Sequence, residues 1–131
     1  MIHIQYQDSL STRATHPSGA TLDTTAPIDN GGKGDRFSPT DLLATALASC
    51  ACTIMGKKAE SMGIALNVEA DVEKIMAANP RRVAEIRITF RFADAHDAKT
   101  RTLLEAAAHS CPVAKSLAPE LVQTLIFHYP A

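Results

Sequence analysis

The N-terminal part of the chain alternates between apolar and polar positions in short stretches. Residues 2–7 place isoleucine or tyrosine at every second position, which is the period of a strand with one buried face. Threonine-rich residues 11–15 and 21–25 predict two more strands, separated by the turn sequence His16–Gly19. We therefore expect an antiparallel meander of three strands, followed by a glycine-containing loop over residues 27–37.

A long apolar helix is predicted to follow this loop. Ser38, Pro39 and Asp41 suit the N-cap, the first and the third helical positions, and Asp41 can complete a capping box with Ser38. The helix should run to about Met62, because Gly63 is a natural C-terminal stop. Much of it is apolar nearly all the way round, which is typical of a helix buried on most sides. We expect it to be the central element of the fold.

The C-terminal half predicts two strands, two helices and a final strand. Residues 66–73 and 84–92 alternate apolar with charged positions, mainly acidic in the first and basic in the second, which predicts a hairpin with facing charges. Residues 97–109 predict a helix, Pro112 opens a second short helix, and residues 122–129 read as a strand. The order β-β-β-α-β-β-α-α-β indicates an α+β fold with a largely antiparallel sheet.

Composition restricts the class of protein. The chain has 131 residues, 46% hydrophobic and 21% charged, which suits one domain over residues 1–131. A net charge of −1 without basic runs argues against nucleic-acid or anionic membrane partners. The N-terminus lacks signal-peptide features, and we expect no apolar stretch to be long enough to span a membrane. Three cysteines without a secretion signal fit a reducing compartment, so we expect a cytoplasmic protein.

The three cysteines are the candidates for chemistry. Cys111 precedes Pro112 at a predicted helix start, where unpaired N–H groups and the helix dipole favour an anion, so we expect a lowered pKa and a reactive thiol. A buried small hydrophobe explains the same position about as well. Cys50 lies in mid-helix, where position alone favours a core role. Cys52 is about 200° further round the helix, so it cannot point to the same place and is predicted to be core.

Other kinds of site fit less well. The glycines near Lys33 do not form a phosphate-binding loop, because Gly34 stands where the pattern needs Ser or Thr. A zinc site of Cys50, His109 and Cys111 has unusual spacing and lacks a fourth ligand. There is no serine-nucleophile elbow and no dinucleotide fingerprint. We therefore expect neither a metal nor an organic cofactor.

Two motifs resemble those of the OsmC/Ohr family, the osmotically inducible and organic hydroperoxide resistance proteins. The first motif, which consists of Gly31-Gly32, Phe37–Leu43 and Ala48-Ser49-Cys50, resembles the family's central helix, in which a proline opens the helix and a cysteine follows about three turns later. The segment Ser110–Ala114 resembles the family's second-cysteine motif. With the strand order, the resemblance covers nearly the whole chain. It implies antiparallel sheets wrapped around long central helices in an intertwined homodimer, with an active site at the dimer interface.

The resemblance also implies thiol-dependent reduction of organic hydroperoxides. Cys50 would attack the peroxide and become a sulfenic acid, Cys111 would resolve it as a disulfide, and an external dithiol would reduce the pair. The family's activating arginine has two candidates here, Arg13 and Arg36, whereas Thr40 occupies the position of a glutamate found in the hydroperoxide-resistance branch. One alternative is an OsmC-like stress-associated or ligand-binding dimer with little peroxidase turnover. Another is a plain structural domain with distant, buried cysteines.

Overall fold

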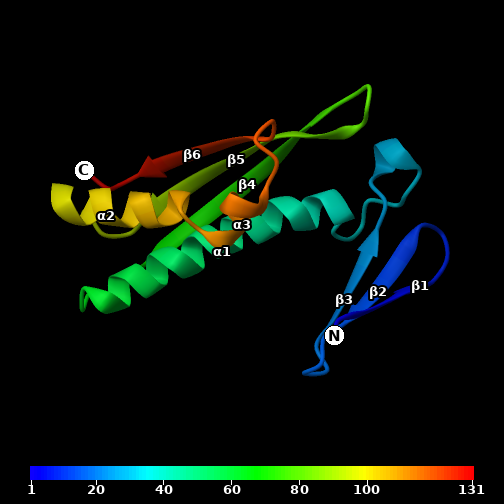
Figure 1. Ribbon diagram of the computed structural model, residues 1–131, viewed down its shortest axis with the longest axis horizontal. Coiled ribbons are helices and arrows are strands. Elements are labelled where there is room, and N and C mark those ends of the chain that lie inside the picture. Colours follow the sequence, from blue (N-terminus) through cyan, green and yellow to red (C-terminus); the bar gives the residue numbers. More distant parts are fainter. The chain divides into compact units, whose positions relative to one another are not determined.

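The computed structural model describes residues 1–131, which form two compact units, Met1–Leu43 and Ala44–Ala131 (Figure 1). That both units belong to one domain over the whole chain, as the sequence predicts, stays a prediction. In chain order the elements are β1 (His3–Tyr6), β2 (Ser11–Thr15), β3 (Thr21–Thr25), a 3₁₀ turn η1 (Ile28–Asn30), α1 (Pro39–Ser61), β4 (Val68–Ala77), β5 (Arg82–Phe92), α2 (Ala98–His109), α3 (Pro112–Ser116) and β6 (Val122–His128).

The first unit is the predicted three-stranded meander. β1, β2 and β3 pair in order and all antiparallel, so this prediction is confirmed. The register places Ile4 opposite Ala14 and Ala14 opposite Leu22, which makes an apolar row across the sheet. Ile4 and Leu22 remain exposed within the chain.

Helix α1 crosses from the first unit into the second and begins with the predicted capping box. The Asp41 backbone N–H donates to Ser38 Oγ at 3.0 Å, and the Ser38 backbone N–H donates to Asp41 Oδ2 at 2.9 Å. At the other end Gly63 adopts a φ of +69°, and the Ile64 N–H donates to the Ala59 carbonyl oxygen, as in a Schellman motif. Both helix boundaries therefore follow from local sequence signals.

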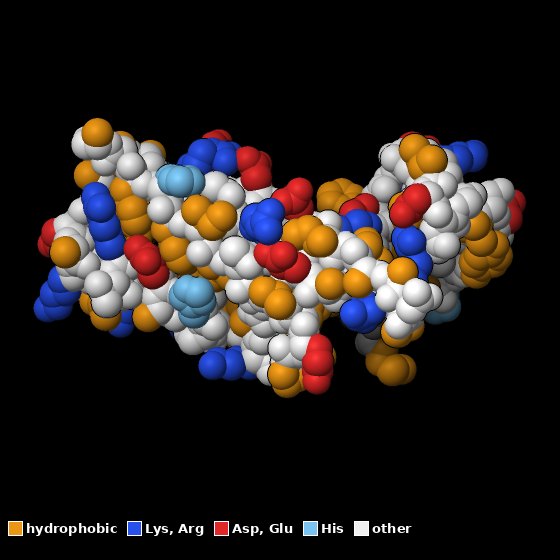
Figure 2. All heavy atoms as spheres, turned by 90° about the horizontal axis from the view of Figure 1, so that it is seen from above, with side chains coloured by type: hydrophobic (Ala, Val, Ile, Leu, Met, Phe, Trp, Pro, Cys, Tyr) orange, Lys and Arg blue, Asp and Glu red, His pale blue; other side chains and the backbone are white.

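The second sheet has the order β4-β5-β6, and its exposed face carries paired charges. β4 and β5 form the predicted hairpin, in which Arg91 lies 2.6 Å from Asp71 and Arg87 lies 3.4 Å from Glu73. Figure 2 shows acidic and basic side chains next to one another on one face of the molecule, with no large area of a single sign. β6 joins the edge of β5 in the parallel direction. The expectation of a largely antiparallel sheet therefore holds for three of the four strand pairs.

The opposite face of this sheet forms the core with the helices. Every second side chain of β5 is buried: Ile86, Ile88, Phe90 and Phe92. The helices contribute Leu104 and Ala108 of α2 and one stripe of α1, whose buried residues are Ala44, Leu47, Ala48, Ala51, Met55 and Ala59. Figure 1 shows α1 and α2 running alongside each other in opposite directions. Within one chain α1 is thus buried along one stripe, not on most sides as the sequence suggested.

The length of α1 corrects a second expectation. With 23 residues and a mean hydropathy of 1.2 over its most apolar 18-residue window, α1 is long and apolar enough to cross a membrane by these two measures alone. The prediction from the sequence underestimated the apolar length of this helix, because isolated Thr and Ser residues interrupt the apolar stretch but lower its mean hydropathy only slightly. One such helix is weak evidence for a membrane span, since the core helix of a soluble protein passes the same test.

Candidate functional site

Cys111 is held at the N-cap of the short helix α3. Its backbone is extended, with φ −67° and ψ 152°, and Pro112 occupies the first turn as predicted. The Ala114 backbone N–H donates to Cys111 Sγ at 3.4 Å, within the range for a sulfur acceptor. The Gln123 side-chain amide of β6 donates to the Ala114 carbonyl oxygen at 3.0 Å and thereby ties α3 to the sheet. The thiol is 0% exposed.

Cys50 meets Cys111 although 60 residues separate them in sequence. The Cys50 side chain lies within hydrogen-bonding reach of the Cys111 thiol, so the fold brings together the two cysteines singled out from the sequence. Both are free thiols, and Cys50 is partly exposed whereas Cys111 is buried. This contact argues against the alternative of a plain structural domain, because that alternative required the two cysteines to be far apart.

The pKa of Cys111 is raised, which contradicts the expectation from its helix-start position. Burial is the main cause, and the neighbouring Cys50 thiol raises the pKa further. The backbone N–H groups of Ala114 and Val113 act in the opposite direction but do not outweigh burial. The prediction failed because α3 has only five residues and its start is enclosed, so desolvation outweighs the local donors.

Cys52 occupies another side of α1 from Cys50. It is partly buried, and burial raises the pKa of its thiol. No group of three or more His, Cys, Asp or Glu residues is placed to hold a metal ion. His109, named in the zinc alternative, has its ring centroid 5.9 Å from that of Phe127.

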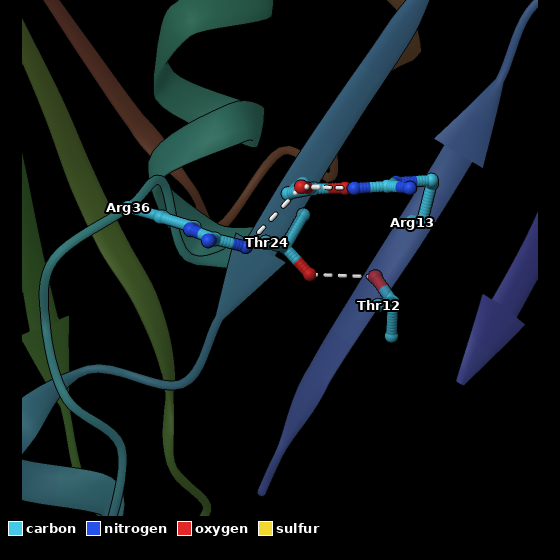
Figure 3. Close-up of polar contacts among 5 residues, drawn as sticks. Thr12, Arg13, Thr24 and Arg36 are labelled. Carbon is cyan, nitrogen blue, oxygen red and sulfur yellow. Dashed lines mark hydrogen bonds and ion pairs between the residues drawn. The ribbon is translucent and has the colours of Figure 1, made fainter. Parts of the chain in front are cut away.

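The two candidate arginines belong to the first unit and share one carboxylate. Arg13 donates from Nε and Nη2 to the two oxygens of Asp23, at 2.7 and 2.9 Å, and Arg36 Nη1 donates to Oδ2 of the same residue at 3.2 Å. Figure 3 shows both guanidinium groups directed at this carboxylate, beside the 2.6 Å contact between the Thr12 and Thr24 hydroxyls. The paired arginine lowers the pKa of Asp23.

Sequence reasoning missed Asp23, although a signal for it was present. In the predicted hairpin the register sets Asp23 directly opposite Arg13, and facing residues of opposite charge pair across strands. At the start of α1, Thr40 Oγ1 lies 3.2 Å from Ser38 Oγ, and Asp41 serves the capping box. The acid that orients the candidate arginines therefore comes from β3 and not from the helix start.

A groove lies between α1 and α2. It has a volume of about 590 Å³, within the range of small-molecule sites. The residues that line it are Ile54, Lys57, Lys58, Ser61, Leu103, Ala106, Ala107 and Ser110. Two of these residues are close to the cysteines in sequence: Ile54 is one turn beyond Cys50 on α1, and Ser110 directly precedes Cys111. The sequence gave no signal for this groove, because its walls come from separate helices.

Comparison with solved structures shows the same architecture. A protein of Psychrobacter arcticus 273-4, provisionally described as an osmotic stress induced and detoxification response protein, is 48% identical, with a TM-score of 0.94 over 97% of this chain and 94% of that chain. An OsmC-like protein of Mycoplasma pneumoniae is 16% identical, with a TM-score of 0.83 over 100% and 96% of the two chains. The organic hydroperoxide resistance protein OhrB of Bacillus subtilis is 16% identical, with a TM-score of 0.73 over 98% of each chain.

The family model for OsmC-like proteins matches residues 32–125, which include the long helix α1 and both cysteines of the pair. No curated protein matches the chain in sequence. The matched segment covers more than half of the chain, and the relative from Psychrobacter arcticus shares nearly half of its residues. This chain is therefore a member of the OsmC-like protein family.

Proposed function

We propose that this protein takes part in peroxide resistance by reducing organic hydroperoxides with the Cys50–Cys111 thiol pair. The observation that carries the proposal is the contact between these thiols, one partly exposed and one buried. Family membership adds support, because fold relatives from Bacillus subtilis and Legionella pneumophila are described as organic hydroperoxide resistance proteins.

The difference in burial supports different roles for the two cysteines in this proposal. Cys111 has no exposed surface and a raised pKa, so it is poorly suited to meet a peroxide first. Cys50 is the accessible member of the pair and would be the attacking residue. Its thiolate attacks the outer oxygen of the hydroperoxide, the O–O bond breaks, and the alcohol leaves with a proton, so that Cys50 becomes a sulfenic acid.

The buried thiol then resolves this intermediate. Cys111 sulfur attacks the Cys50 sulfenic sulfur, its proton goes to the departing hydroxide, and water leaves as the disulfide forms. An external dithiol returns both residues to thiols. A buried resolving thiol has an advantage: it is protected from over-oxidation until the sulfenic acid forms beside it.

The attacking thiolate would gain from a nearby cation, and Arg13 and Arg36 are the candidates. Arg13 uses two of its nitrogens on Asp23, whereas Arg36 uses one, so Arg36 keeps more donors available. An assembly of two chains is also part of the proposal, since the apolar α1 is buried on one stripe only within a single chain. A cytoplasmic location would supply the dithiol reductant.

One experiment tests the chemistry directly. Purified protein should consume cumene hydroperoxide with a dithiol reductant, Cys50→Ser should abolish consumption, and Cys52→Ser should retain most of it as a control on the same helix. Cys111→Ser should accumulate a sulfenic acid on Cys50 that dimedone can trap. Consumption that survives Cys50→Ser would rule out the proposed mechanism.

A second candidate function is an OsmC-like stress-associated or ligand-binding protein with little peroxidase turnover. The observation in its favour is that Thr40 replaces the glutamate of the hydroperoxide-resistance branch, while both candidate arginines are engaged by Asp23. This function predicts that Cys50 reacts with one equivalent of hydroperoxide but that turnover with excess dithiol stays slow.

A further inference from the structure

A polar side chain occupies a core-facing position of β6. Three residues of this strand, Gln123, Leu125 and Phe127, lie beside buried residues of β5 in the parallel register. The rings of Phe127 and Phe90 stack with their centroids 5.0 Å apart, so these side chains share the core face of the sheet. Gln123 is thus the polar member of an apolar row. A polar group on such a face requires a hydrogen-bond partner, and its amide donates to the Ala114 carbonyl oxygen at 3.0 Å.

This hydrogen bond joins the short helix α3 to β6. With five residues, α3 is too short to be stable by itself, so its position depends on contacts from outside the helix. The hydrogen bonds from the Lys115 N–H and the Ser116 hydroxyl stay within residues 111–116. The last carbonyl groups of a helix have no partner inside it, and the Ala114 carbonyl finds one in the Gln123 amide.

Ala114 connects the Gln123 amide to the buried thiol. Its N–H donates to Cys111 Sγ at 3.4 Å, while its carbonyl oxygen accepts from Gln123. Both groups flank one Cα atom and belong to planar peptides, so holding the carbonyl also restrains the direction of the N–H. The Cys50 side chain lies within hydrogen-bonding reach of the same thiol. A continuous set of contacts therefore runs from β6 through α3 to the thiol pair.

We propose that Gln123 is a positioning residue for the resolving thiol: its hydrogen bond to Ala114 keeps the Cys111 sulfur within reach of Cys50, so that the disulfide forms rapidly. For the sulfenic acid this inference rests on the proposed function. In that step the Cys111 sulfur attacks the Cys50 sulfur, the S–O bond breaks, and water leaves with the Cys111 proton. A disulfide requires Cα atoms within about 7 Å, so a small displacement of α3 slows the step without changing Cys50.

Thiol–disulfide exchange measures the position of Cys111 without a peroxide. In a Cys52→Ser background, one equivalent of dithionitrobenzoate should release thionitrobenzoate twice. The Cys50 thiolate displaces the first by attacking the reagent, and Cys111 displaces the second from the mixed disulfide on Cys50. Gln123→Met keeps the volume of the side chain but cannot donate a hydrogen bond. It should leave the rate of the first release unchanged and slow the second on the order of tenfold.

Two further variants separate positioning from stability. Gln123→Glu should show the same difference between the two releases, because its carboxylate accepts hydrogen bonds but does not donate them. Thr124→Val is the matched control on β6: it removes a 2.7 Å hydrogen bond to Glu85 on the opposite face of the sheet and should leave both releases unchanged. Equal slowing of both releases in Gln123→Met would indicate a merely structural role and overturn the proposal, as would a second release at the wild-type rate.

Cumene hydroperoxide distinguishes this proposal from the proposed function. With one equivalent, Gln123→Met should form the Cys50 sulfenic acid at the wild-type rate, but dimedone should trap it for a period on the order of tenfold longer. Disulfide formation as fast as in the wild type would refute the positioning role alone. If the wild type does not react with the hydroperoxide, and the two releases from dithionitrobenzoate still differ in Gln123→Met, the peroxidase function fails and the role of Gln123 stands.

Discussion

Raising the pH should destabilise this protein through Cys111. The native pKa of this thiol is raised, mainly by burial, whereas in the unfolded chain it returns to about 8.5. Above that pH the unfolded state loses the thiol proton while the native state keeps it. The unfolded state then binds fewer protons, so the free energy of unfolding must fall as pH increases, until the native thiol also titrates.

The size of this effect follows from the linkage relation. Each group titrating only in the unfolded state contributes at most about 1.4 kcal/mol per pH unit. Because the unfolded thiol is half ionised near pH 8.5, the contribution of Cys111 between pH 8.5 and 9.5 is a loss of at most about 1 kcal/mol, reached if the native thiol stays protonated throughout. Cys52, whose pKa burial also raises, adds a loss of the same sign.

A comparison with Cys111→Ala isolates this residue from other titrating groups. Urea unfolding at pH 7.5, 8.5 and 9.5, at one protein concentration and with reductant present, gives the free energy for both proteins. The free energy of unfolding of the wild type relative to Cys111→Ala should fall between pH 8.5 and 9.5, by at most about 1 kcal/mol. If this difference in the free energy of unfolding instead grows with pH, the native state stabilises the thiolate of Cys111. The N–H groups at the helix start would then outweigh burial, and the reasoning would be wrong.

Three further predictions concern the fold and the other cysteine. Ser38→Ala should lower the free energy of unfolding by about 1–2 kcal/mol, because it removes a buried capping hydrogen bond, and Ser49→Ala on the exposed side of α1 should have little effect in the same thermal melts. Cys52→Ala should cost roughly 1–2 kcal/mol in stability and leave hydroperoxide reactivity intact; activity lost with the fold preserved would show that the wrong cysteine was chosen. Sedimentation at micromolar concentration should give twice the chain mass, since the apolar α1 needs further cover, and a clean monomer would contradict this.

Much of the local structure was determined by neighbouring residues in the sequence. The capping box at Ser38 and the stop at Gly63 depend on groups within five residues of each other, so both ends of α1 could be predicted from the sequence. The β4–β5 hairpin could also be predicted, because apolar and charged residues alternate along both strands and the charges of the two strands are opposite. The importance of Cys50 and Cys111 was visible only through two short motifs taken together.

Tertiary structure decided the properties that depend on which segments meet. The parallel addition of β6 to β5 joins strands far apart in the chain, and no local pattern distinguishes it from antiparallel pairing. The raised pKa of Cys111 has the same origin: its donors are local, but the burial that outweighs them, and the Cys50 thiol beside it, come from the packing of distant elements. The groove near Lys57 likewise exists only where α1 and α2 lie together. The periodicity of the sequence therefore determined the helices and strands, whereas the exclusion of solvent where they pack determined the raised pKa of Cys111.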